Sequence, residues 1–274
     1  MSRFFLIMTV LLAMVTMACG EGTDRRNEPK RVVIISQAPD GHPWNTHEFR
    51  AGARILKQIL DGHSEVTAVI VDADTSPRRI PEAIDQADAV VLLVSEGARW
   101  VGTNEKSREA LKRLAARGGG ITALHWAVGT RDARYIEIGK QLWGGVHGGP
   151  DRQYTVSQAT MIPNREHPIT RGLEPLTIRD EWYHHLKFAR EGTITPLWTV
   201  EIKGEPQTVS WAWERTNGGR SFGFVGLHFH QNWAEETYRD FVSWGVLWTL
   251  HIEREPGVLS LDFAREDLEM PRPK

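Results

Sequence analysis

Apolar and amphipathic segments alternate along the first half of the chain. Short runs made almost entirely of Val, Ile, Leu and Ala predict buried strands at 31–36, 66–72, 89–95 and 120–125. Between them, helices are predicted at 46–60, 77–87 and 104–120; in the first, Phe49, Ala53, Leu56 and Leu60 recur at helical spacing and Thr46 is the expected cap. Strands that are apolar throughout and alternate with helices are typical of a parallel sheet covered on both faces.

The pattern changes after about residue 150. Segments 154–162, 192–200, 206–215 and 220–229 read as strands with polar breaks, and 234–253 reads as a closing amphipathic helix. No internal repeat separates the two halves. We therefore expect one α/β domain with an elaborated second half, and not two independent units.

Composition excludes some classes of function. The 274 residues are 41% hydrophobic, which supports a large core. Lys and Arg number 33 against 35 Asp and Glu, for a formal charge of -2. This balance gives no electrostatic basis for a nucleic-acid partner.

The amino terminus predicts export. Arg3 precedes an apolar run from Phe4 to Ala18, and Cys19, the only cysteine, follows directly. We expect a signal peptide at 1–18, a lipidated Cys19 and a polar linker at 19–30. The mature protein would then be a lipoprotein, periplasmic or at the cell surface, held to the membrane by its lipid anchor alone. The alternative is an ordinary signal peptide with a chance cysteine.

Histidines follow several predicted strands. Parallel α/β sheets bind ligands beyond the carboxyl ends of their strands. His47 follows the first strand, His125 the fourth, and His228 and His230 the last. If the last strand is parallel, these side chains gather at one edge of the sheet. In an extended backbone His228 and His230 would also share a face.

Segment 180–188 adds a carboxylate to this set. If it is extended, Glu181, Tyr183 and His185 lie on one face. Imidazole and carboxylate suit zinc and similar divalent cations, although no fixed-spacing zinc motif is present. We expect a divalent metal bound by His125, His185, His228 and His230, with Glu181, His125 and His47 as catalytic residues. The alternative is that single histidines such as His125 merely cap strands.

Aromatic residues accompany these polar groups. Tryptophans are usually core residues, but beside polar groups at strand ends they also suit stacking on sugars. Trp44 and Trp100 have such neighbours. The expected substrate-binding residues are Trp126, Trp182, Tyr183, Asn232 and Trp233.

The order of several motifs resembles one family. These are "GHPWNTHEFRAGARIL", "ITALHWAV", "HPITRGLEPLTIRDEWYHHLKF" and "VSWAWERTNGGRSFGFVGLHFHQNW". Together they resemble the trehalose-utilisation (ThuA-like) family, in its membrane-associated bacterial branch, over about 31–258. Residues 259–274 would then be a carboxyl-terminal tail.

The resemblance implies a flavodoxin-like fold similar to class I glutamine amidotransferases. Those enzymes carry a cysteine at a sharp turn after a strand, and this chain carries His125 there. Cysteine-based amide hydrolysis is therefore excluded. Of the neighbouring pair His184 and His185, the likeness favours His185 as the inward one.

The resemblance also implies carbohydrate chemistry. We expect metal-assisted hydrolysis, elimination or isomerisation of a sugar or an oxidised (3-keto) glycoside, a small-molecule partner. The alternative is a sugar-binding lipoprotein without chemistry, for which a cluster of imidazoles would be surplus. A flavoprotein is disfavoured because "QAPDGHPW" offers no phosphate-cradling loop.

Overall fold

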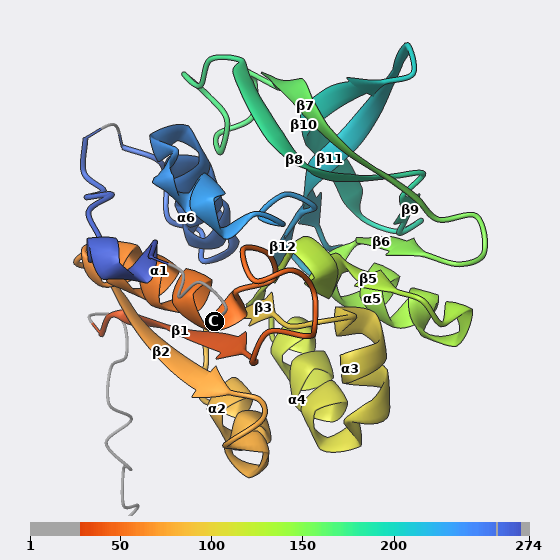
Figure 1. The fold of residues 1–274 in the computed structure, drawn as a ribbon. Coiled ribbons are helices and arrows are strands. Elements are labelled where there is room, and N and C mark those ends of the chain that lie inside the picture. Colours follow the sequence, from red (N-terminus) through yellow and green to blue (C-terminus); the bar gives the residue numbers. More distant parts are fainter. Residues whose placement is uncertain (1–27, 256, 270–274) are drawn as a thin grey trace, which may run out of the picture.

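A nine-stranded mixed sheet forms the centre of the protein (Figure 1). The computed structural model describes residues 28–255 and 257–269. The strands follow the order β2-β1-β3-β4-β12-β11-β10-β7-β8. Their bounds are β1 (Lys30–Ser36), β2 (Val66–Asp72), β3 (Ala89–Leu93), β4 (Gly120–Leu124), β7 (Gln153–Pro163), β8 (Leu176–His184), β10 (Thr193–Ile202), β11 (Glu205–Glu214) and β12 (Arg220–Phe224).

The sheet is parallel on one side and antiparallel on the other. Strands β2, β1, β3, β4 and β12 pair in parallel, and β12 also pairs antiparallel with β11. The predicted parallel sheet is thus confirmed, and the last strand of the parallel part, β12, meets the condition for gathering the histidines at one edge. Strand β12 joins the two halves into one continuous sheet.

Helices cover both faces of the parallel strands, as predicted. Helix α1 (Phe49–Asp61) contacts α6 (Glu236–Thr249) on one face. On the other face lie α2 (Ile80–Asp85), α3 (Gly97–Thr103) and α4 (Glu105–Ala116), with α5 (Ile136–Trp143) beyond α3 (Figure 1). The buried apolar residues of the strands pack between these layers, for example Val33, Ile35, Val91 and Leu92.

Two predicted boundaries next to the histidines are wrong. Helix α1 begins at Phe49, and Glu48 caps it by accepting a hydrogen bond from the amide of Ala51, 3.2 Å away. Thr46 instead forms an isolated bridge with Phe229. The last strand ends at Phe224, so residues 225–229 are not extended strand.

The antiparallel strands extend over the carboxyl ends of the parallel ones (Figure 1). Strands β7 and β8 form a long hairpin at the edge of the sheet. A second sheet of β5 (Gly129–Thr130), β6 (Gly145–Gly148) and β9 (Lys187–Phe188) lies beside it. Strand β8 thereby carries Glu181 and Tyr183 to the edge where the parallel strands end.

The expected tail, 259–274, is described to residue 269. Leu261, Phe263 and Leu268 pack against the core, and Asp267 accepts hydrogen bonds from Arg54 and Gln58 on α1. Among the described residues, none of the helices has the length and apolarity needed to span a bilayer. The predicted signal peptide, Cys19 and most of the linker lie outside the described residues.

Candidate metal centre

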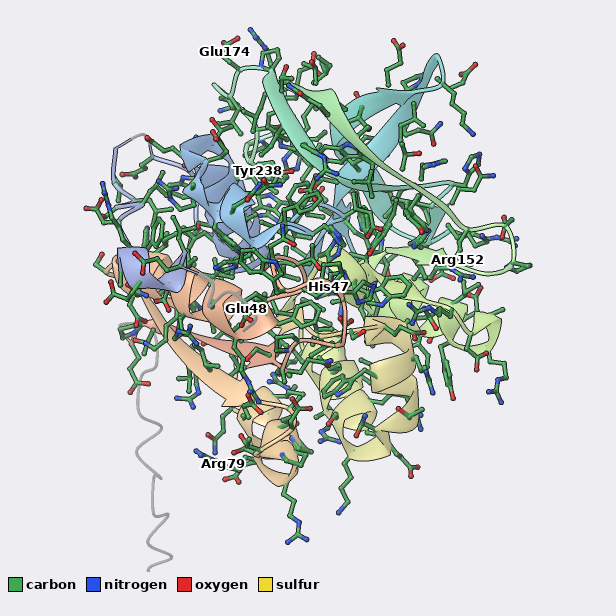
Figure 2. All side chains as sticks on the ribbon, in the orientation of Figure 1. His47, Glu48, Arg79, Arg152, Glu174 and Tyr238 are labelled. Carbon is green, nitrogen blue, oxygen red and sulfur yellow. The ribbon has the colours of Figure 1, made fainter. Side chains whose placement is uncertain are left out.

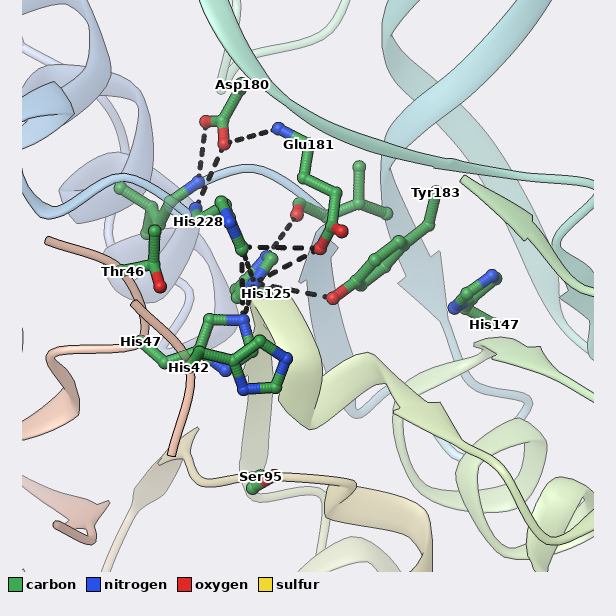
Figure 3. Close-up of polar contacts among 12 residues, drawn as sticks. His42, Thr46, His47, Ser95, His125, His147, Asp180, Glu181, Tyr183 and His228 are labelled. Carbon is green, nitrogen blue, oxygen red and sulfur yellow. Dashed lines mark hydrogen bonds and ion pairs between the residues drawn. The ribbon is translucent and has the colours of Figure 1, made fainter. Parts of the chain in front are cut away.

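Three imidazoles meet where β1, β4 and β12 end. His47 lies in the loop after β1, His125 directly follows β4, and His228 lies four residues after β12. All three are buried, and Figure 3 shows their rings converging below strand β8. Figure 2 labels His47 in the middle of the molecule, far from peripheral side chains such as Arg79 and Arg152.

The facing nitrogens are close together. His47 Nε2 lies 2.9 Å from His125 Nε2 and 3.1 Å from His228 Nδ1. His228 Nδ1 lies 3.2 Å from His125 Nε2. Glu181 Oε2 completes the group, 3.3 Å from His228 Nδ1 and 3.8 Å from His125 Nε2. The four side chains form a cluster whose candidate ligand atoms lie within 4.8 Å of one another.

Strained backbone turns the histidines into this cluster. His47 and His125 adopt left-handed φ values of 52° and 50°, and Leu227, just before His228, adopts 79°. Such conformations cost free energy in residues other than glycine, and they concentrate at functional sites. His125 therefore occupies a sharp turn after its strand. In the sequence comparison with class I glutamine amidotransferases, this is the position of their cysteine.

Hydrogen bonds fix the proton of two rings on the side away from the cluster. His47 Nδ1 lies 2.9 Å from Asp40 Oδ2, and the carboxylate can only accept. His125 Nδ1 lies 2.8 Å from the carbonyl oxygen of Val225, which also only accepts. In their neutral forms both rings therefore present a bare Nε2 lone pair to the cluster.

The three rings favour the neutral form. Burial lowers the pKa of His47, and burial together with the neighbouring His47 and His228 lowers the pKa of His125 well below its usual value. Burial and His47 lower the pKa of His228 to about 3. Burial alone would raise the pKa of Asp40, but hydrogen bonds from His47 and Ser95 bring it well below its usual range. Near pH 7 the cluster thus holds neutral imidazoles backed by a carboxylate.

Glu181 and Tyr183 border the imidazoles. Burial raises the pKa of Glu181 to about 6, although a hydrogen bond with Tyr183 opposes this. The Tyr183 hydroxyl lies 3.3 Å from His125 Nε2, and its ring stacks between those of His125 and His147. Burial raises the pKa of Tyr183 well above its usual value, so its hydroxyl keeps its proton. A carboxyl that titrates near neutrality therefore adjoins a hydroxyl donor.

The donor set fits a divalent cation. Zinc lies about 2.0–2.1 Å from imidazole nitrogen, so tetrahedral ligands are about 3.3 Å apart. The observed separations of 2.9–3.2 Å come close to this. His47, His125 and His228 would therefore hold such a cation through these three nitrogens. The contacts of Asp40 and the Val225 carbonyl with the outer nitrogens match the usual outer support of metal-bound histidines.

Two of the predicted ligands lie elsewhere. His230 begins a short 3-10 helix (His230–Ala234), and its Nε2 lies 2.5 Å from the carbonyl oxygen of Asp267. It does not share a face with His228, because the chain has left the strand before these residues. His185 follows the end of β8 with a left-handed φ of 58° and is exposed, whereas His184 is buried. The expectation that His185 is the inward one of this pair is therefore wrong.

Only some of the predicted substrate-binding residues lie at the cluster. Tyr183 lies in the site, and the Trp126 ring lies 5.5 Å from its ring, with a buried indole nitrogen that has no hydrogen-bond partner among the described residues. Trp182 points to the other side of β8, is fully buried and donates to the Ser157 carbonyl, so it is a core residue. Trp233 packs against Gly52 of α1, and Asn232 donates to Asp180.

Two important carboxylates were missed by sequence reasoning. Asp40 accepts from His47, and it also contacts His42, whose ring stacks on that of His47 at 3.8 Å. Asp180 is fully buried beside Glu181 and contacts the loop that carries His228. The sequence signal for either is slight: each is an acidic residue close to a residue already expected in the site.

Fold and site together define an α/β protein with a histidine-lined cluster at the carboxyl edge of its sheet. The model of the ThuA family, described as trehalose utilisation, matches residues 31–249. The chain therefore belongs to the ThuA family, which associates it with carbohydrate utilisation. A search of curated proteins finds no match.

Comparison with solved structures gives one similarity that supports the fold. A ThuA-like protein from Bacteroides uniformis aligns with a TM-score of 0.61 and 14% identity, covering 84% of this chain and 95% of that one. PurLQS from Thermotoga maritima aligns at 0.48 with 14% identity, over 80% of this chain and 99% of that one. The glutaminase domain of Trypanosoma brucei CTPS aligns at 0.45 with 8% identity, over 82% of this chain and 96% of that one. The first likeness supports a ThuA-like fold.

Proposed function

We propose that this protein binds a divalent cation, zinc or similar, through His47, His125 and His228 and uses it to process a sugar or an oxidised (3-keto) glycoside. One observation carries the proposal. The bare Nε2 atoms of His47 and His125 face each other at 2.9 Å, with their protons held on the far side. Two lone pairs at that distance repel unless they share a proton or both bind one metal cation, and burial disfavours the extra proton.

The remaining groups suit proton transfer. When bound, the cation would polarise a carbonyl or lower the pKa of a water. Burial raises the pKa of Glu181 to about 6 and the bound cation would lower it, so near pH 7 its carboxylate can accept a proton, as a general base does. Tyr183, whose hydroxyl keeps its proton, can donate a hydrogen bond to a substrate oxygen beside His125. Three imidazoles with Glu181 as the base leave a coordination position for substrate, as in catalytic zinc sites.

The cluster is least covered along one edge. The side chains of His47 and His125 are 1% exposed, whereas those of His228 and Glu181 are 9% and 12% exposed. Substrate would therefore approach along the edge formed by the latter two.

Strand β7 borders this edge with exposed apolar side chains. Val156 lies directly opposite Glu181, and Tyr154 lies directly opposite Tyr183. The two side chains of such a pair share one face of the sheet, with Cβ atoms about 5 Å apart. Tyr154 is 61% exposed. An exposed aromatic ring beside polar groups is suited to stacking on a sugar. This supports a carbohydrate ligand, in agreement with the family.

The rival proposal is a sugar-binding protein without chemistry. It needs aromatic and amide groups but no convergent imidazole lone pairs, so the cluster favours an enzyme.

Metal analysis tests the proposal directly. The purified protein should contain about one divalent ion per chain, which a chelator removes. His228→Ala should lose the ion, while His230→Ala, a matched buried histidine two residues away, should keep it. His125→Asn, which tolerates the left-handed backbone, should also lose it. Turnover should then be sought on glycosides and 3-keto-glycosides. A wild-type protein without metal, together with full activity in both cluster variants, would refute the proposal.

We further propose an exported, lipid-anchored protein. The support is the apolar run 4–18 followed by Cys19. Cys19→Ala should leave the precursor without lipid and release the protein from membranes. Unchanged membrane fractionation and mass would refute the anchor.

A further inference from the structure

Asp180 is a fully buried carboxylate next to the cluster. It lies on β8, directly before Glu181, and its carboxylate points toward the backbone of the loop after β12 (Figure 3). Its oxygens accept from the amides of Leu227 at 2.8 Å, His228 at 3.0 Å and Glu181 at 2.8 Å. They also accept from Asn232 Nδ2 at 3.0 Å and the Tyr238 hydroxyl at 2.9 Å. Burying a charge is costly without such partners.

These contacts fix the segment that carries the third imidazole. Residues 225–229 belong neither to a helix nor to a strand, and Leu227 has a left-handed φ of 79°. Such a conformation persists only where surrounding contacts enforce it. The two consecutive amides of Leu227 and His228 both donate to the Asp180 carboxylate.

His228 is held from both sides of its backbone. Its amide donates to Asp180, and its carbonyl oxygen accepts from the amide of His47 at 3.1 Å. The same carboxylate accepts from the amide of Glu181. Asp180 thus contacts the backbone of His228 and Glu181 directly. His228 in turn contacts His47, so the three cluster residues are connected.

We propose that Asp180 is the positioning residue that sets His228 Nδ1 in place to bind the cation and Glu181 Oε2 in place beside it as the base. It touches neither the ion nor substrate and acts through these two residues. The inference rests on the proposed metal function. If Asp180 only stabilised the fold, its substitution would lower Tm and leave metal affinity unchanged. If it positions the cluster, its substitution should also weaken metal binding.

The test compares Asp180→Asn with Tyr238→Phe. The asparagine keeps the size of the side chain, but its amide group cannot accept from all five donors. The Tyr238→Phe control removes one buried donor to the same carboxylate and leaves the contacts to Leu227, His228 and Glu181 intact. Both variants and the wild type are titrated with Co²⁺, whose visible spectrum reports coordination geometry. Hydrogen exchange of residues 225–229 is measured in the metal-free proteins.

The expected results separate the two variants. Asp180→Asn should bind Co²⁺ about 10–100-fold more weakly, with an altered spectrum and faster exchange at Leu227 and His228. Tyr238→Phe should keep the affinity, the spectrum and the slow exchange, even if its Tm falls. If Asp180→Asn is not recovered folded, Asp180→Ser, which keeps one acceptor, takes its place with the same expectations.

Three results would overturn the inference. Wild-type affinity and spectrum in Asp180→Asn would remove the positioning role while the metal function stands. Equal losses in both variants would reduce Asp180 to a general stabiliser. Absence of Co²⁺ binding by the wild type itself would reject the proposed function and this inference together.

Discussion

Replacing Asp40 should weaken metal binding without removing any ligand. Asp40 Oδ2 lies 2.9 Å from His47 Nδ1 and also accepts from Ser95 Oγ at 2.6 Å. Asp40→Asn changes a charge-assisted hydrogen bond, worth about 1.5–3 kcal/mol, into a neutral one of about 0.5–1.5 kcal/mol. The difference of about 1.4 kcal/mol corresponds to a roughly tenfold loss of affinity. Asp40→Ala also frees the ring to rotate, so its loss should approach about 100-fold.

Competition with a chromogenic zinc chelator measures both losses. The matched control is Asp72→Asn at the end of β2, where Asp72 accepts from Arg50 at 2.6 Å and has no contact with the cluster. This control should bind zinc within twofold of the wild type. The reasoning fails if Asp40→Asn also stays within twofold, or if the control loses as much affinity as Asp40→Asn.

Three further predictions concern the base, the substrate edge and the core. Burial raises the pKa of Glu181 to about 6 before a cation binds, and the bound cation would lower it, so wild-type turnover should rise with pH across a midpoint below about 6. Glu181→Gln should keep the metal and lose turnover by about 100-fold; loss of the metal would instead make Glu181 a ligand. Tyr154→Ala should raise KM for a glycoside about fivefold or more with kcat little changed. Ile162 is also exposed on this strand, and Ile162→Ala should leave both constants unchanged. Equal effects of the two substitutions would reject the stacking role of Tyr154. Trp182→Ala should cost about 3–5 kcal/mol in urea unfolding, because the side chain is fully buried, and a loss below about 1 kcal/mol would contradict its core assignment.

The parallel half of the fold could be predicted from sequence because its signal is local. Strands β3 and β4 are buried throughout and β1 is buried from Val32 onward, and their direction follows from the helices between them. The rule that ligands bind at the carboxyl ends of such strands then brought His47, His125 and His228 together. Glu181 and Tyr183 followed from the alternation of an extended strand.

The errors arose where tertiary contacts set the backbone. His228 and His230 share a face only in an extended chain, but the strand ends at Phe224 and Leu227 turns left-handed. Hydrophobic periodicity carries no information about such a turn. The roles of Asp40 and Asp180 depend on partners 7 and 48 residues away, His47 and His228, and no local pattern records that pairing.

The insertion of β12 between β4 and β11 has a consequence for the order of folding. His47 and His228 are separated by 181 positions, and His125 and His228 by 103. Contacts this distant in sequence form late, because the entropy of closing the intervening chain must first be overcome. A chain that has folded only its first four strands holds two of the imidazoles and cannot complete the cluster. Cation uptake would therefore follow closure of the sheet, and the bound ion would then oppose its reopening. At a free concentration of 100 times Kd it would add about 2.7 kcal/mol to the free energy of unfolding.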